Sequence, residues 1–156
     1  MNLGYQIVQF FYLLSLSLWI GGTLVFGALS APVIFQKETS RTQAGKIVEE
    51  ILRRFDIVKW VFLVVLVLAN VVRLRVWDQP SVFVGLRVLG VLGLCVAFFV
   101  SLSLSIKMRT LKGVIKNFDE TPETDPNRVT FNQWHKQSVR LTLIQFVCAL
   151  VALFFW

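Results

Sequence analysis

The side chain with the widest chemical range in this sequence is His135, the single histidine among 156 residues. Its imidazole could bind a ligand, carry a proton near neutral pH or take part in hydrogen bonds. If the surrounding residues are helical, side chains at steps of three and four residues share one face with it. That face carries His135, Ser138, Thr142 and Gln145 and ends at Ala149. The spacing predicts a polar seam along one helix.

This polar seam, His135 to Gln145, has three interpretations. Its side chains could form hydrogen bonds that fix helix register, bind an ion, a small solute or a lipid headgroup, or support proton-linked chemistry. Asn70, and Ser101 or Ser105, lie in other apolar runs and are candidate partners for the seam. Asp56 could lie at a similar depth to His135 and hold its proton.

The sequence contains few of the residues that a metal site, a haem site or a catalytic site requires. Copper sites need several Met, Cys or His side chains close together, but the chain has two methionines, one of them Met1, and Cys95 and Cys148 stand alone in separate apolar runs. A haem held by two histidines needs a second one. The sequence has no glycine-rich phosphate loop, no Ser-His-Asp triad and no carboxylate pair placed for acid–base catalysis. We therefore expect no metal, no cofactor and no enzyme activity.

The elements that must position these residues are apolar runs. Apolar residues make up 56% and charged residues 16% of the chain, against about 45–50% and about 25% in soluble domains. Four stretches, 1–36, 60–72, 88–106 and 141–156, contain no charged side chain. Backbone groups in hydrocarbon must pair within a helix or a closed barrel, and the strict alternation of a barrel is absent. We predict an all-α, polytopic integral membrane protein: a four-transmembrane-helix bundle with cytoplasmic helical extensions.

We expect one membrane domain over 1–156, with spans at about 5–33, 56–77, 82–107 and 126–155. An amphipathic helix at about 41–55, with a capping box at Ser40 and Gln43, should run into the second span or lie flat on the membrane. The third helix should extend to about 117, followed by a loop over 118–125. Asp125 should cap the fourth helix, and Lys59 can bury its stem and reach the headgroups. The first span is too long for a cleaved signal peptide.

Basic residues indicate the orientation. Twelve lie in segments 37–55 and 107–140, whereas the middle connection between the second and third apolar runs holds Arg73, Arg75 and Arg87. Because Lys and Arg collect in cytoplasmic loops, we expect segments 37–55 and 107–140 in the cytoplasm and both termini outside the cell (inner) membrane. The net charge of +7 then reflects topology and contact with membrane lipids, and we expect no nucleic-acid partner.

Small residues indicate how the helices pack. Gly93, Ala97, Ser101 and Ser105 recur every four residues in the third predicted span, as do Thr23, Gly27 and Ala31 in the first. Small side chains let helix backbones approach closely in lipid. We predict that the first and third spans meet along these faces, although a ligand groove would be lined in a similar way.

Three stretches, "WIGGTLVFGALSAPVIF", "RTQAGKIVEEILRRFD" and "FNQWHKQSVRL", resemble the family called domain of unknown function 4149, which includes mammalian transmembrane protein 205. The matching positions are Trp19, Gly21, Gly22, Ala31, Pro32, Phe35, Ala44, Gly45, Phe131, His135 and Ser138. A weaker likeness is to the membrane domain of copper-resistance protein D. The resemblance implies a four-helix membrane protein, and the mammalian member is linked with resistance to platinum drugs and with vesicle traffic. A family histidine in the first helix is absent here, and Thr142 stands where an asparagine is expected.

Two functional hypotheses remain. The first is binding or export of a small solute or metal-containing compound along the polar seam, as a single bundle or a homo-oligomer. The second is an accessory or assembly subunit that docks through small-residue faces, at Gly27 or Gly93, onto other membrane protein subunits.

Overall fold

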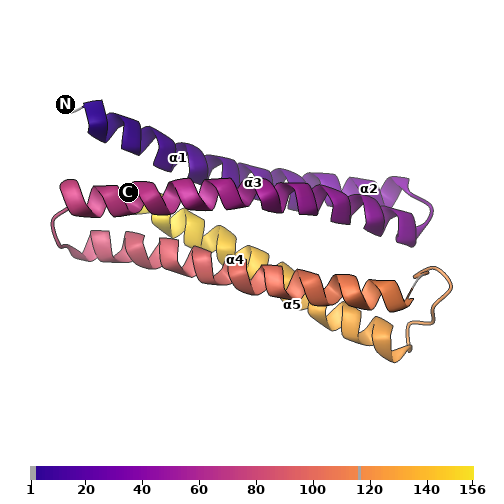
Figure 1. Cartoon of the computed structure of the whole chain (residues 1–156). Helices are drawn as coiled ribbons and strands as arrows, with labels where there is room; N and C mark the ends of the chain where they lie inside the picture. Colours follow the sequence, from indigo (N-terminus) through magenta and orange to yellow (C-terminus); the bar gives the residue numbers. More distant parts are fainter. Residues whose placement is uncertain (1–2, 116) are drawn as a thin grey trace.

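The computed structural model describes residues 3–115 and 117–156, and these form four long helical rods (Figure 1). The first rod consists of α1 (Leu3–Leu24), a π-helical segment η1 (Val25–Ser30) and α2 (Ala31–Lys37). The others are α3 (Arg41–Val76), α4 (Val82–Ile115) and α5 (Pro126–Phe154). All four rods are long and apolar enough to cross a membrane. The predicted all-α, four-helix membrane fold is confirmed.

The π-helical segment η1 has a cause in the sequence. Pro32 has no backbone N–H, so the α-helical bond from that position cannot form. Immediately before it, the Ala31 N–H donates to the Phe26 carbonyl, five residues back. Ser30 Oγ likewise donates to the Val25 carbonyl, at 3.1 Å. The wider turn therefore lets the first rod continue from Leu3 to Lys37 without a break.

Helix α3 joins the amphipathic stretch to the following apolar run without interruption. Its N-terminus is capped by Ser40, whose Oγ accepts from the Gln43 N–H at 3.2 Å. Helix α5 begins after Asp125, whose Oδ1 accepts from the backbone N–H groups of Asn127 and Arg128 at 2.8 and 3.1 Å. Both predicted N-caps are confirmed. The depth of each helix in the membrane stays a prediction.

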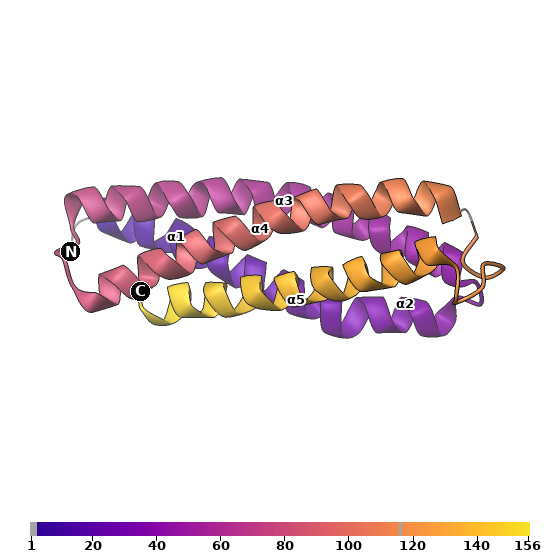
Figure 2. The same cartoon turned by 90° about the horizontal axis from the view of Figure 1, so that it is seen from below.

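The rods do not pack equally. Helices α4 and α5 make the most extensive contact, α1 packs on α3 and on α5, and α3 touches α4 only slightly although a short turn joins them. Figures 1 and 2 show the α3–α4 turn and the N-terminus at one end of the bundle, which we call the turn end. The α2–α3 connection and the α4–α5 loop lie at the other, which we call the basic end.

The small residues of α4 face α5. A Cβ added at Gly90 would lie 2.9 Å from the Ala152 backbone nitrogen, and one at Gly93 would lie 2.8 Å from Cys148 Sγ. Gln145 Nε2 donates to the carbonyl of Ala97 at 3.3 Å. These small residues of α4 therefore allow the α4 and α5 backbones to approach closely, as predicted for small residues in lipid.

The prediction that the first and third spans meet along their small faces is wrong. Within the described residues α1 and α4 have no close backbone contact; they meet through the large rings of Trp19 and Phe98, whose centroids are 5.3 Å apart. Two rings packed edge to face hold the backbones apart. Gly27 is exposed, and no heavy atom of the described chain other than its own helix neighbours lies within 4 Å of where its Cβ would stand.

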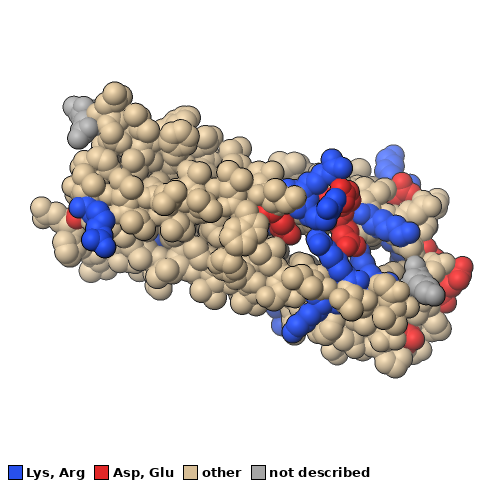
Figure 3. Space-filling view, in the orientation of Figure 1, with Lys and Arg blue, Asp and Glu red and all other residues tan. Residues whose placement is uncertain are grey.

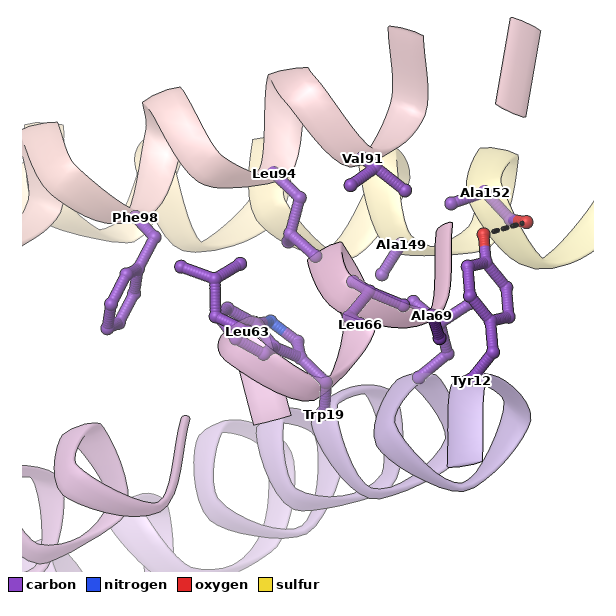
Figure 4. Packing of buried hydrophobic residues seen from close by; sticks show 11 residues of the cluster. Tyr12, Trp19, Leu63, Leu66, Ala69, Val91, Leu94, Phe98, Ala149 and Ala152 are labelled. Carbon is purple, nitrogen blue, oxygen red and sulfur yellow. Dashed lines mark hydrogen bonds between the residues drawn. The ribbon is translucent and has the colours of Figure 1, made fainter. Parts of the chain in front are cut away.

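The core lies where all four rods come together. Figure 4 shows side chains from α1, α3, α4 and α5 interleaved, with Tyr12 and Trp19 reaching in from α1. The Tyr12 hydroxyl donates to the Ala152 carbonyl at 3.0 Å. Around this core many large apolar side chains, such as Leu68, Leu89 and Leu143, are exposed. Such a surface suits hydrocarbon rather than water.

Candidate binding site

The polar seam of α5 passes from the surface into the core. His135 is exposed, Ser138 and Thr142 are half-buried, and Gln145 is 1% exposed. Thr142 Oγ1 donates to the Ser138 carbonyl of its own helix at 3.1 Å. Gln145 is therefore the seam residue that the bundle encloses.

Only one of the two polar atoms of the Gln145 side chain has a hydrogen-bond partner. Its Nε2 donates across the helix pair to the Ala97 carbonyl. Its Oε1 is buried and has no hydrogen-bond partner among the described residues. An amide oxygen can accept two hydrogen bonds, so this side chain presents an acceptor inside the bundle.

Helix α1 presents two more polar atoms to the interior. Trp19 is 1% exposed, and in the part of the chain that the structure describes its Nε1 has no acceptor. Thr23 lies one helical turn further on, and its buried Oγ1 has no partner within residues 3–115 and 117–156. We call Gln145 Oε1, Trp19 Nε1 and Thr23 Oγ1 the buried trio.

Lys59 of α3 lies beside Trp19. It is 5% exposed, and its Nζ stands 4.7 Å from the ring centroid of Phe55 and 5.4 Å from that of Trp19. The nearest carboxylate oxygen is Asp56 Oδ1, at 3.9 Å. The Lys59 ammonium is therefore held inside the bundle by ring faces and one carboxylate. Its depth relative to the headgroups stays a prediction.

These groups are linked through one row of contacts. Lys59 lies against Trp19, Trp19 packs on Phe98, and the neighbour of Phe98, Ala97, accepts the hydrogen bond from Gln145. The row crosses from α3 through α1 and α4 to α5. It links a cation, a hydrogen-bond donor and an acceptor by successive contacts through the bundle.

The other predicted site residues lie elsewhere. The His135 ring lies parallel to that of Phe131, at 6.3 Å between centroids, and no hydrogen bond to it is found among the described residues. Asp56 pairs with Lys59 rather than with His135. Asn70 Oδ1 accepts from Arg87 Nε at 3.1 Å, near the turn end. The structure therefore does not gather the predicted residues into one site.

The matching family model supports the resemblance seen in the sequence. It is the one described as "Domain of unknown function (DUF4149)", and it matches residues 14–114. The chain belongs to the DUF4149 family. No curated protein and no solved structure matches the chain, so the likenesses to transmembrane protein 205 and to copper-resistance protein D stay predictions.

The DUF4149 match covers Trp19, Thr23 and Lys59 but ends before α5. Sequence reasoning missed these three residues as site candidates. The available signal was Lys59, the one charged residue among 57–72, because an ionisable residue inside an apolar span is a functional candidate by default.

Charged side chains of this DUF4149 protein gather at the basic end, where Figure 3 shows openings between them. Lys112 of α4 donates to Glu49 Oε2 at 2.9 Å and to the Gly45 carbonyl at 3.3 Å, both on α3. Arg109 approaches the same glutamate at 3.4 Å. These ion pairs bridge α3 and α4 where their backbones have little contact.

Among the described residues no cluster of three His, Cys, Asp or Glu side chains could hold a metal ion.

Proposed function

We propose that this integral membrane protein of the DUF4149 family binds a small polar solute at the buried trio, without catalysing a reaction on it. The observation that carries the proposal is that three polar side-chain atoms of the bundle are each buried without a hydrogen-bond partner among the described residues, and that Lys59, also buried, lies against Trp19. A buried polar group without a partner costs about 1–3 kcal/mol. A solute that satisfies these groups would recover much of that free energy.

The chemistry of the trio defines the solute class. Gln145 Oε1 requires an N–H or O–H donor, Trp19 Nε1 requires an acceptor, and Thr23 Oγ1 can serve as either. The Lys59 ammonium favours an acceptor that is anionic or strongly polar. A small carboxylate, amide or amino acid has this combination. A metal-containing compound would bind through N–H or O–H groups on its own ligands.

The proposed path follows the charge asymmetry. Segments 37–55 and 107–140 lie in the cytoplasm and both termini lie outside the inner membrane, as the positive-inside rule indicates. A solute would then approach from the basic end, where α3 and α4 are joined chiefly by Lys112, Arg109 and Glu49. The polar seam continues from this end toward Gln145, from the exposed His135 through the half-buried Ser138.

Two conservative substitutions test the proposal. Trp19→Phe keeps an aromatic ring facing Phe98 but removes the N–H donor together with the five-membered part of the indole, and Gln145→Leu removes the amide. Ser103→Ala is the matched control, because Ser103 is exposed and donates to Phe99 of its own helix. Each protein, in lipid nanodiscs, is dialysed against a defined panel of small carboxylates, amides and amino acids, and retained solute is measured by mass spectrometry.

We expect the wild type and Ser103→Ala to retain the same panel member and both trio variants to lose it by about tenfold, as for loss of one buried hydrogen bond. Retention of nothing by the wild type, or equal retention by Trp19→Phe and Gln145→Leu, would count against the proposal.

A second candidate function is docking onto another membrane protein subunit or a second copy. The observation that favours it is the open surface at Gly27, since the described residues leave room there for a close helix. Gly93 no longer supports docking, because it faces Cys148 of α5. Gly27→Leu should release a partner during mild-detergent purification, whereas Gly113→Leu, at an equally open position of α4, should not. Co-purification that persists in Gly27→Leu would exclude this surface.

A further inference from the structure

Two arginines and one aspartate are enclosed at the turn end. Arg87 of α4 is fully buried, and its Nη2 donates to Asp78 Oδ2. Arg73 Nε donates to Asp78 Oδ1 at 2.9 Å. The side chains of Arg73 and Asp78 are 11% and 8% exposed. One carboxylate therefore serves two guanidinium groups, and the cluster holds one excess positive charge.

The other side chains in contact with this cluster are uncharged. Asn70 accepts from Arg87 Nε. Trp156 lies flat beneath Arg73, whose guanidinium carbon is 3.7 Å from its ring centroid. Tyr12 also stacks on this indole, with ring centroids 4.0 Å apart. These rings orient the guanidinium, but they do not neutralise its charge.

Two donors of the cluster are buried together. Arg73 Nη1 and Trp156 Nε1 have no acceptor in the described part of the chain, and the two side chains are stacked on one another. We call these atoms the donor pair. An excess buried charge beside two such donors is costly unless an anion completes it.

We propose that the donor pair, with the Arg73 and Arg87 charges behind it, binds a phosphate-type oxyanion at the turn end of the bundle. Arginine is suited to phosphate because its donors form a fixed, always-charged fork. The turn end carries Trp77 and Trp156, residues that favour the headgroup level of a bilayer. A surface pocket of about 330 Å³ lies on the Asp78 side of the cluster; its lining includes Leu74 and Val84 but not the donor pair. The phosphate can come from a lipid headgroup or be free in solution.

The test uses the full chain in phospholipid-free detergent and three variants. Arg73→Gln removes the excess charge and leaves Asp78 paired one to one with Arg87. Trp156→Phe keeps the stacked ring and removes the N–H. Arg75→Gln is the matched control, because Arg75 is a neighbouring exposed arginine. Inorganic phosphate is titrated with thermal unfolding as the readout, and bound phosphatidylglycerol is counted by native mass spectrometry.

We expect the wild type and Arg75→Gln to bind, and Arg73→Gln to bind about tenfold more weakly, as for loss of a charge-assisted contact. Trp156→Phe should be weakened by a smaller factor. Stabilisation by inorganic phosphate identifies a free oxyanion, and retention of phosphatidylglycerol alone identifies a headgroup. Without either ligand, Arg73→Gln should unfold at the same temperature as the wild type or higher; a purely structural ion pair predicts a lower one.

The proposal would be overturned if the wild type bound neither inorganic phosphate nor phosphatidylglycerol. Equal binding by Arg73→Gln and Arg75→Gln would overturn it as well. Neither result bears on the buried trio, which involves different residues.

Discussion

At the scale of single residues, Arg87 and Lys59 are two buried cations that the bundle holds in different ways. Arg87 has a carboxylate and an amide as hydrogen-bond partners. Lys59 has two ring faces and a carboxylate at 3.9 Å. A cation held mainly by ring quadrupoles keeps much of its capacity to bind an incoming acceptor. Lys59 is thus better placed than Arg87 to exchange partners with a solute.

Replacing Asp56 with Leu should lower the free energy of unfolding by about 3 kcal/mol, because Lys59 would stay buried without its carboxylate. Adding Lys59→Met should restore stability to at least the wild-type value, since an apolar pair avoids desolvating two charges. The four proteins form a double-mutant cycle, measured by unfolding in mixed micelles. Additive effects of the two substitutions would show that the pair does not interact.

At the scale of elements, caps and helix continuity could be predicted, but helix partners could not. Ser40 and Asp125 were predictable because a cap depends on a few neighbouring residues. The α1–α4 pairing was wrong because small-residue stripes show which faces permit close approach, not which helix approaches. The large side chains of Trp19 and Phe98 lie between α1 and α4 and keep their backbones apart. Their contact depends on the packing of the whole bundle.

The α4–α5 contact should be sensitive to a single methyl group. Gly90→Ala places a Cβ against the α5 backbone, at 2.9 Å from the Ala152 nitrogen. We expect the free energy of unfolding to fall by about 1–3 kcal/mol, as for overpacked cores. Gly85→Ala, at an open position of the same helix, should not lower it. The measurement is unfolding in mixed micelles, and equal stability of the two variants would contradict the close packing.

The α4–α5 loop holds the start of α3 through Asp119. Its carboxylate accepts from Ser40 Oγ at 2.6 Å and from the Arg41 N–H at 2.8 Å. These bonds lower the pKa of Asp119 to about 2, Ser40 Oγ making the largest contribution. Because the folded pKa lies below the unfolded value of about 3.9, the stabilisation is present above that value and is lost as pH falls toward 2.

We expect Asp119→Asn to lower the unfolding temperature at pH 7, and the difference from wild type to disappear as pH falls from about 4 to about 2. Glu120→Gln, a neighbouring exposed carboxylate, is the control and should behave like the wild type at both pH values. A difference that is constant across this pH range would mean that the carboxylate charge plays no part.

At the scale of the whole molecule, hydrophobic composition was enough to predict a four-span membrane protein. Uncharged runs are long and need no tertiary information to recognise. The candidate sites were harder to predict, because Gln145, Trp19 and Lys59 are far apart in sequence and meet only in the bundle. The sequence did not predict the cluster of Arg73, Asp78 and Arg87. Arg73 and Arg87 were interpreted only as basic residues of the middle connection, since residues beside a predicted turn are usually solvated. Folding of the turn buried two of these three side chains almost completely.

Orientation can be tested with single cysteines in a background where Cys95 and Cys148 are alanine. Gln79→Cys, in the α3–α4 turn, should react with a membrane-impermeant maleimide added to intact cells. Thr124→Cys, at an exposed position of the α4–α5 loop, should react only after the cells are opened. This outcome follows from the excess of Lys and Arg at the basic end. The reverse labelling pattern would invert the proposed topology.

The wide turn at Val25–Ser30 has a consequence for sequence length. A π turn accommodates one more amino acid than the α-helix around it, so everything after it is rotated by about 100° relative to an unbroken helix. A homologue shorter by one position here could keep Trp19 and Thr23 facing inward while turning Phe35 and its neighbours to a new direction. Length variation at this point would therefore change which partners the exposed end of the first rod meets and leave the interior intact.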